Sequence, residues 1–330
     1  MTDLIGHPPL DAEIEAAFNA LPEDSRWRAT IGASANFGEI SKRRERMAAL
    51  AMSDEELRYD GKIEFEELSI PGPAGAPELA TLVMRPTKFA GPRPCIYFLH
   101  GSGMVMPGNR TMMGPEHLHW VGDLGAIVVS VDYRVGPEDQ HPAPVEDCYA
   151  GLVWASRHAA DIGANPDHLI LAGTSGGGGL AAATALLNRD RDGVALTHQI
   201  LICPMLDDRE ITVSSKFEGV VWDRASNAAG WGALLGDGRG GPNVTMYAAP
   251  ARATDLSGLP STYLDTGSSE VFRDEIIDYG ARLAMANVPV ELHVWSGAMH
   301  GSENMVPDAL ITRAARAARD SFVTRALRSR

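Results

Sequence analysis

Apolar residues gather in two different patterns along this chain. From residue 8 to about residue 58 they recur every three or four positions, which predicts two or three helices with no strand between them. Residues 62–70 and 79–85 are instead rich in β-forming residues, and a proline follows each run. We therefore expect a helical leading segment followed by two strands that are antiparallel to each other.

Six further strands are predicted by short apolar runs that are separated by helical segments. Continuous apolar runs, unlike alternating ones, indicate strands that are buried on both faces, as in a parallel sheet covered by helices on each side. The runs are residues 95–99, 127–131, 168–172, 200–203, 262–264 and 290–295. The expected fold class is α/β, with a mostly parallel central sheet.

One connection is too long for an ordinary crossover between two parallel strands. It runs from Leu206 to about Leu256 and contains a glycine-rich stretch at residues 236–241. Together with the helices of residues 1–58, it is the candidate for a helical cap over the carboxyl edge of the sheet. The expected organisation is an N-terminal cap segment at 1–58 and an α/β domain at 59–330, with a cap insertion at about 206–256.

Composition narrows the range of partners. The chain has 330 residues, and its net charge of -14 argues against nucleic acid, since binding a polyanion needs clustered Lys and Arg. We expect neither a signal peptide nor a membrane span, because no apolar stretch approaches roughly 20 residues. Cys95, Cys148 and Cys203 lie far apart in apolar segments, so buried thiols of a reduced, cytoplasmic protein are expected, with no disulfide and no metal site.

A candidate nucleophile is Ser175, in the run Gly173-Thr174-Ser175-Gly176-Gly177. Gly-x-Ser-x-Gly is a common pattern in a chain with 34 glycines, so its setting matters more than the motif. The run follows a predicted strand and precedes an alanine-rich helical segment, which is the strand–turn–helix arrangement of a nucleophile elbow. Such a turn projects the serine over the carboxyl edge of the sheet.

Two other interpretations of these glycines are open. Gly177, Gly179 and Ala182 match a relaxed dinucleotide fingerprint, but parallel strands already precede it, and the next strand runs into Pro204 without an acidic residue. No Lys follows the glycines, which excludes a phosphate-binding P-loop. The remaining alternative is a glycine turn with a surface serine. We expect no cofactor.

An acyl-transfer serine also needs backbone N–H donors and a base. The strand at 95–99 ends in His100-Gly101-Ser102-Gly103, so Ser102, Gly103 and Gly176 are the candidate donors of an oxyanion hole. His300 lies in a glycine-flanked loop after the last strand and is the candidate base, whereas His293 lies within that strand and is expected to pack.

The acid of the site has three candidates by its place in the chain. Asp265 stands at the end of a strand, which is too early for this role. Asp274 begins a helix, where a first-turn acid also has a structural explanation in the helix dipole. Glu270 lies between them, and spacing by itself leaves the choice open.

These motifs together resemble those of the bacterial hormone-sensitive-lipase-like esterases, over roughly residues 60–302. The resemblance rests on residues 100–103, 132–138, 173–177, 272–275 and 300–301. It implies an α/β-hydrolase fold and a carboxylesterase that acts without a cofactor, mostly on short-chain esters. It also implies that Asp132, Tyr133 and Arg134 brace the oxyanion loop.

The chain departs from the family pattern at its acid. The family usually has Asp where this chain has Glu270, and Glu can also orient an imidazole. We therefore favour Glu270, with Asp274 as the alternative acid. The family's Gly-Asp-Ser-Ala-Gly is here Gly-Thr-Ser-Gly-Gly, and Ser102 stands in the middle of its oxyanion triplet. Both departures preserve the backbone donors.

The expected function is hydrolysis of carboxylic esters of short to medium acyl chain, through an acyl-enzyme on Ser175 with His300 and Glu270. An amidase or a lactonase would use the same triad, and a non-catalytic ligand-binding relative would normally lose part of it. Small-molecule esters are the expected partners. An edge strand or the last helix offers a surface for a homodimer.

Two charged segments are expected to face solvent. Residues 116–119, Glu-His-Leu-His, invite interpretation as metal ligands, but no third ligand is in evidence and an exposed helix face is preferred. The last helix carries arginines that are expected to form a solvated face. These are Arg313, Arg316, Arg319 and Arg325.

Overall fold

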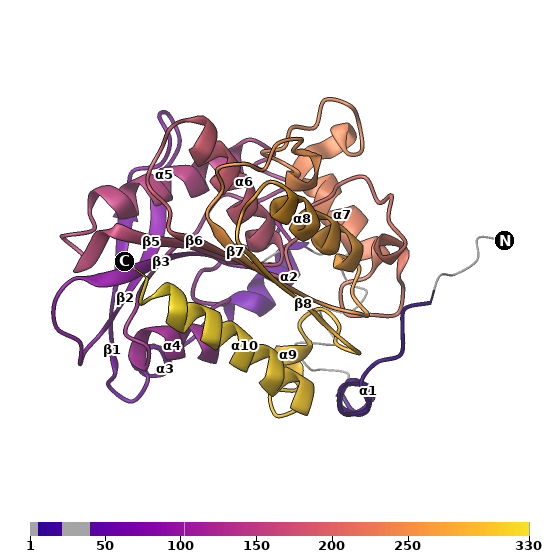
Figure 1. Ribbon diagram of the computed structural model, residues 1–330, viewed down its shortest axis with the longest axis horizontal. Helices are drawn as coiled ribbons and strands as arrows, with labels where there is room; N and C mark the ends of the chain where they lie inside the picture. Colours follow the sequence, from indigo (N-terminus) through magenta and orange to yellow (C-terminus); the bar gives the residue numbers. More distant parts are fainter. Residues whose placement is uncertain (1–5, 22–39, 102, 330) are drawn as a thin grey trace.

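A twisted sheet of eight strands runs through the part of the chain that this computed structural model describes, residues 6–21, 40–101 and 103–329 (Figure 1). The spatial order is β1-β2-β4-β3-β5-β6-β7-β8. β2 is antiparallel to both of its neighbours and all other pairs are parallel. The strands are β1 (Ile63–Ile70), β2 (Leu79–Pro86), β3 (Arg93–Leu99), β4 (Ile127–Val131), β5 (Ala164–Thr174), β6 (His198–Ile202), β7 (Ser261–Gly267) and β8 (Val290–Trp295).

Helices cover both faces of this sheet, which explains why its central strands are apolar without interruption. Figure 1 shows α5, α6 and α8 on one side and α3, α4 and α10 on the other. In β3, Tyr97 packs into the first layer, while Ile96 and Phe98 pack into the second. The helices are α1 (Ala12–Asn19), α2 (Ile40–Ala48), α3 (Asp54–Arg58), α4 (Pro115–Gly122), α5 (Ala143–Arg157), α6 (Gly176–Asp190), α7 (Arg224–Leu235), α8 (Arg273–Met285), α9 (Ser302–Met305) and α10 (Leu310–Ala326). The predicted α/β class and all eight predicted strands are confirmed.

The N-terminal helices contact loops that follow the carboxyl ends of the strands. Beside α1, the backbone N–H of Asp11 donates to the carbonyl of Gly297 at 3.0 Å. Arg44 of α2 donates to the carbonyls of Val105 and Gly136, each at 2.9 Å. The long connection between β6 and β7 contains α7 and short 3-10 turns. Among the described residues, no helix combines the length and the apolarity needed to cross a bilayer.

The prediction of a solvated arginine face on α10 is wrong at Arg319. Arg313 and Arg325 are exposed, but Arg319 is 1% exposed because its position on the helix faces α4 and β7. The exposed face predicted for residues 116–119 is also wrong. His117 is buried and its ring lies 4.1 Å from that of Phe98. Apolar spacing gave no sign of these contacts, since both segments bury polar groups.

The prediction that all three cysteines are buried is wrong for Cys203. Cys95 and Cys148 are buried, whereas Cys203 is half-buried and lies just beyond the end of β6. All three are free thiols.

The turn after β5 allows a direct test of the fold. A Cβ on Gly177 would lie 2.3 Å from the carbonyl oxygens of both Leu99 and His100, whereas a Cβ on Gly232 in α7 would meet nothing within 4 Å. We expect Gly177→Ala to lower the free energy of unfolding by about 3 kcal/mol, because the backbone must move. Gly232→Ala, the matched control, should raise it by about 0.5–1 kcal/mol through helix propensity. Urea denaturation measures both, and equal effects would contradict the proposed close packing.

Candidate active site

Ser175 occupies a strained turn between β5 and α6. Its φ of 57° and ψ of -124° lie in a region that L-residues rarely adopt. Hydrogen bonds hold the backbone of Ser175 at both its N–H and its carbonyl. The N–H donates to the carbonyl of Ile202 at 2.8 Å, and the carbonyl accepts from the N–H groups of Gly179 and Met205, each at 3.0 Å. This backbone conformation therefore directs the side chain away from the sheet and toward the loops at its carboxyl edge.

His300 reaches Ser175 from the loop that follows β8. The Nε2 atom of His300 lies 2.9 Å from the hydroxyl oxygen of Ser175, and its Nδ1 atom lies 2.5 Å from Oε1 of Glu270. An ionised carboxylate only accepts, so Nδ1 carries the hydrogen and Nε2 is left as the acceptor for the serine hydroxyl. The next residue, Gly301, has a φ of 72°, which lets the loop turn back immediately into α9.

Of the three predicted acids, Glu270 is the one that contacts His300. It is 1% exposed, and its second oxygen accepts from the Thr266 hydroxyl at 3.2 Å and from the Gly267 N–H at 3.1 Å. Asp274 instead accepts from the N–H of Ser214 at 2.8 Å. Asp265 pairs with Arg319 at 2.6 Å. Bonds on both oxygens fix the orientation of the Glu270 carboxylate toward the imidazole.

The oxyanion loop lies against the turn that carries Ser175. A Cβ on Gly176 would stand 3.0 Å from the amide nitrogen of Gly103, and a Cβ on Gly101 would stand 3.4 Å from the Cβ of Ser175. Gly176 is also the first residue of α6, whose positive dipole end favours negative charge at this point. Ser102, the third candidate donor, lies outside the described residues.

The segment after β4 packs against the oxyanion loop. The Tyr133 hydroxyl donates to the carbonyl of His100 at 2.6 Å, and the two rings stack at 4.4 Å. Asp132 accepts from the Gly108 N–H at 2.5 Å, and Arg134 pairs with the buried Asp147 at 2.7 Å. These contacts agree with the bracing role that the resemblance implied.

A tryptophan from the long connection covers the site. A Cβ on Gly103 would lie 2.2 Å from the ring of Trp222, so this ring packs directly on the oxyanion loop. Its centroid is 6.2 Å from that of His300. Trp222 therefore lies beside both the oxyanion loop and the base.

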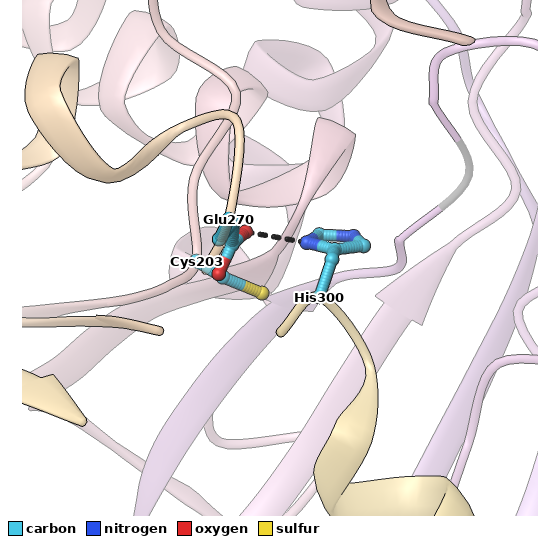
Figure 2. Close-up of side chains that lie close together, drawn as sticks. All are labelled: Cys203, Glu270 and His300. Carbon is cyan, nitrogen blue, oxygen red and sulfur yellow. Dashed lines mark hydrogen bonds and ion pairs between the residues drawn. The ribbon is translucent and has the colours of Figure 1, made fainter. Parts of the chain in front are cut away.

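Cys203 lies closer to this site than its place in the sequence indicated. Figure 2 shows its side chain beside Glu270 and His300, and the three ligand-type atoms lie within 4.8 Å of one another. These residue types can hold a metal ion, but the glutamate and histidine atoms already bond to each other, and burial raises the pKa of the Cys203 thiol well above its ordinary value. The donor set thus fits an acid–base pair with a neutral thiol beside it. Sequence spacing missed this neighbour because β6 and β7 become adjacent only in the sheet.

The comparisons with known proteins agree with this geometry. Residues 96–304 match a family model described as alpha/beta hydrolase fold. Esterase LipI of Mycobacterium tuberculosis is 35% identical over 245 residues, which cover 73% of this chain and 75% of the relative. The solved structure of a bacterial heroin esterase is 36% identical with a TM-score of 0.87, and covers 97% of this chain and 98% of that one.

A shorter part of the chain is similar to a hormone-sensitive lipase, the protein after which the predicted family is named. Hormone-sensitive lipase of Ictidomys tridecemlineatus is 32% identical over 123 residues, 37% of this chain and 16% of the lipase. The resemblance that the motifs indicated and the fold class are therefore both confirmed. The chain belongs to the α/β-hydrolase family, among the hormone-sensitive-lipase-like esterases.

Proposed function

We propose that this protein hydrolyses carboxylic esters through a covalent acyl-enzyme formed on Ser175. Ester hydrolysis is the activity named for its relatives, among them esterase LipI and the bacterial heroin esterase. The observation that carries the mechanism is the continuous line of bonds from the Ser175 hydroxyl through His300 to Glu270. A nucleophile, a base and an orienting acid in this sequence of contacts are what acyl transfer by serine requires.

In the first half-reaction, the Ser175 oxygen attacks the ester carbonyl while Nε2 of His300 accepts its proton. The negative charge that develops on the carbonyl oxygen is held by the N–H groups of Gly103 and Gly176, with Ser102 as the further donor expected from the sequence. His300 then donates the proton to the leaving alcohol. A water molecule repeats the steps to release the acid, and Glu270 stabilises the imidazolium each time without taking up its proton.

The described parts of residues 1–58, together with residues 206–256, form the cap in this proposal. Three contacts support it: Asp11 on the loop before His300, Arg44 on the loops after β3 and β4, and Trp222 on Gly103. All of them lie at the carboxyl edge of the sheet, where α/β folds bind ligands. The homodimer and the cytoplasmic location stay predictions, although β8 does stand at an edge of the sheet.

Removal of the serine tests the mechanism. We expect a fluorophosphonate to label the wild-type protein at Ser175, and Ser175→Ala to lower kcat/KM for p-nitrophenyl butyrate about 10⁴-fold or more, because the covalent route is lost. Ser321→Ala, which changes an exposed serine on α10, is the control and should keep both labelling and activity. An unlabelled wild-type protein, or an active Ser175→Ala variant, would refute the proposal.

A pair of isosteric variants tests the acid. Glu270→Gln keeps the shape of the side chain but removes the charge that orients the imidazole, so kcat should fall about 10³-fold or more. Asp274→Asn should change kcat only a few-fold, since Asp274 bonds Ser214 rather than His300. Steady-state kinetics on one ester decides between them. The assignment is wrong if Asp274→Asn causes the larger loss of kcat.

The position of Trp222 generates a prediction about substrate size. Because its ring packs on Gly103 and faces His300, it limits the space next to the reacting carbonyl, in agreement with short to medium acyl chains. Trp222→Ala should raise kcat/KM for p-nitrophenyl decanoate relative to the acetate by roughly tenfold or more. Trp154→Ala, which changes a stacked tryptophan on α5, is the control. An unchanged chain-length profile for Trp222→Ala would remove Trp222 from the acyl pocket.

A further inference from the structure

Behind the triad, a buried arginine contacts three carboxylates from three other elements. Arg319 of α10 is 1% exposed. Its Nη1 atom donates to both oxygens of Glu116 in α4, at 2.8 and 2.7 Å. Its Nη2 atom donates to Asp265 in β7 at 2.6 Å and to Glu303 in α9 at 3.0 Å. A buried charge cluster of this kind is costly to assemble, and replacement by apolar residues is often neutral or stabilising. Stability therefore does not explain it well.

We propose that Glu303, held in place by Arg319, is a positioning residue for His300 and a second carboxylate that stabilises its imidazolium. This inference rests on the proposed function, in which His300 becomes charged in each half-reaction. It assigns Arg319 an indirect part in the reaction, through Glu303.

The first support is the way in which α10 holds the segment after the base. Glu303 lies three residues after His300, in a helix of four residues that begins after the turn at Gly301. Arg316 donates to the backbone carbonyl of Glu303 at 2.9 Å, while Arg319 binds its carboxylate. Two arginines about one turn apart on α10 thus bind the backbone and the side chain of Glu303. Because α9 is so short, a displacement of Glu303 moves the His300 loop.

The second support is a cavity that connects the ion cluster with the triad acid. Its volume is about 40 Å³, and its lining includes Glu270, Met299, Glu303 and Arg319. The residue before the base, a carboxylate of the cluster and the acid that bonds His300 therefore line the same small cavity. Partly buried charges around such a cavity are screened less than charges at the surface.

The charges of the cluster do not cancel. One guanidinium faces three carboxylates, with Arg316 on α10 as a further cation and His300 and Glu270 on the triad side. Burial raises the pKa of Glu303, but Arg319, Arg316 and His300 outweigh it and the net pKa is lowered. For Glu116 and Asp265 burial dominates and their pKa values are raised. Glu303 is thus the member that stays ionised most readily, and the one nearest to His300 in the chain.

Glu303→Gln is the decisive variant, because an amide oxygen can still accept from Arg319 while the charge is gone. We expect kcat to fall about tenfold with KM unchanged within about twofold, since only the charged imidazolium loses stabilisation. The acid limb of the kcat/KM profile should move to lower pH by about half a unit, because the free enzyme loses a charge that favours protonation of the base.

Variants of Arg319 test the hold on Glu303. Arg319→Met should lower kcat at least as much as Glu303→Gln, and Arg319→Lys should recover part of the loss by restoring one charged contact. Arg313→Met, which changes an exposed arginine of the same helix, is the control and should match wild type. If Arg319→Met fails to fold, Glu303→Gln alone still decides.

Three outcomes are distinguishable in this experiment. A shifted acid limb with reduced kcat in Glu303→Gln supports the inference. A lower Tm with unchanged kcat and unchanged pH profile shows a purely structural cluster and overturns it. Wild-type protein that a fluorophosphonate does not label would instead refute the proposed function itself, whatever the Glu303 variants do.

Discussion

The site depends on one constraint, the strained turn that carries Ser175. Ser175 has a backbone φ of 57°, a conformation that glycine adopts much more readily than other residues, and contacts with neighbouring residues hold it there. Gly177 has to be small because a Cβ there would lie 2.3 Å from the carbonyl oxygens of both Leu99 and His100, and this same approach brings the oxyanion loop to the serine. The strain, the packing of β3 on α6 and the proposed oxyanion hole are therefore consequences of one local geometry.

Electrostatics then determines how the base is held. Glu270 is buried, bonded on both oxygens and in direct contact with His300, so its orientation is fixed before any substrate arrives. The Arg319 cluster lies on the other side of a small cavity and reaches the His300 loop through Glu303. In the proposed mechanism the two carboxylates have different tasks, since Glu270 orients the ring and Glu303 adds charge and anchors the loop.

Segments that are remote in the chain meet at the carboxyl edge of the sheet. Pro8 accepts from the hydroxyl of Ser269, next to Glu270, and Asp11 bonds the loop that leads to His300. Trp222, from the connection between β6 and β7, packs on Gly103. The proposed cap is thereby coupled to the acid, the base and the oxyanion loop, so that the shape of the substrate site and the alignment of the triad depend on the same contacts.

The sequence by itself predicted the fold class, the eight strands, and the nucleophile and base of the candidate site. Continuous apolar runs indicate most of these strands because a strand that is buried on both faces has few polar positions. A glycine-rich turn between strand and helix, as at Ser175, is likewise a local feature that the chain carries openly.

Only the tertiary structure decided which acid reaches His300. Glu270 and Asp274 are four residues apart, and spacing cannot show that α8 turns Asp274 toward Ser214. The tertiary structure also places Arg319 in the interior and Cys203 beside the triad, and the sequence predicted neither position. Such contacts join segments from different strands and helices, and they bury polar groups whose partners lie up to 203 positions away in the chain. Hydrophobic periodicity reports only which face of an element is apolar, and it carries no information about the pairing of buried charges.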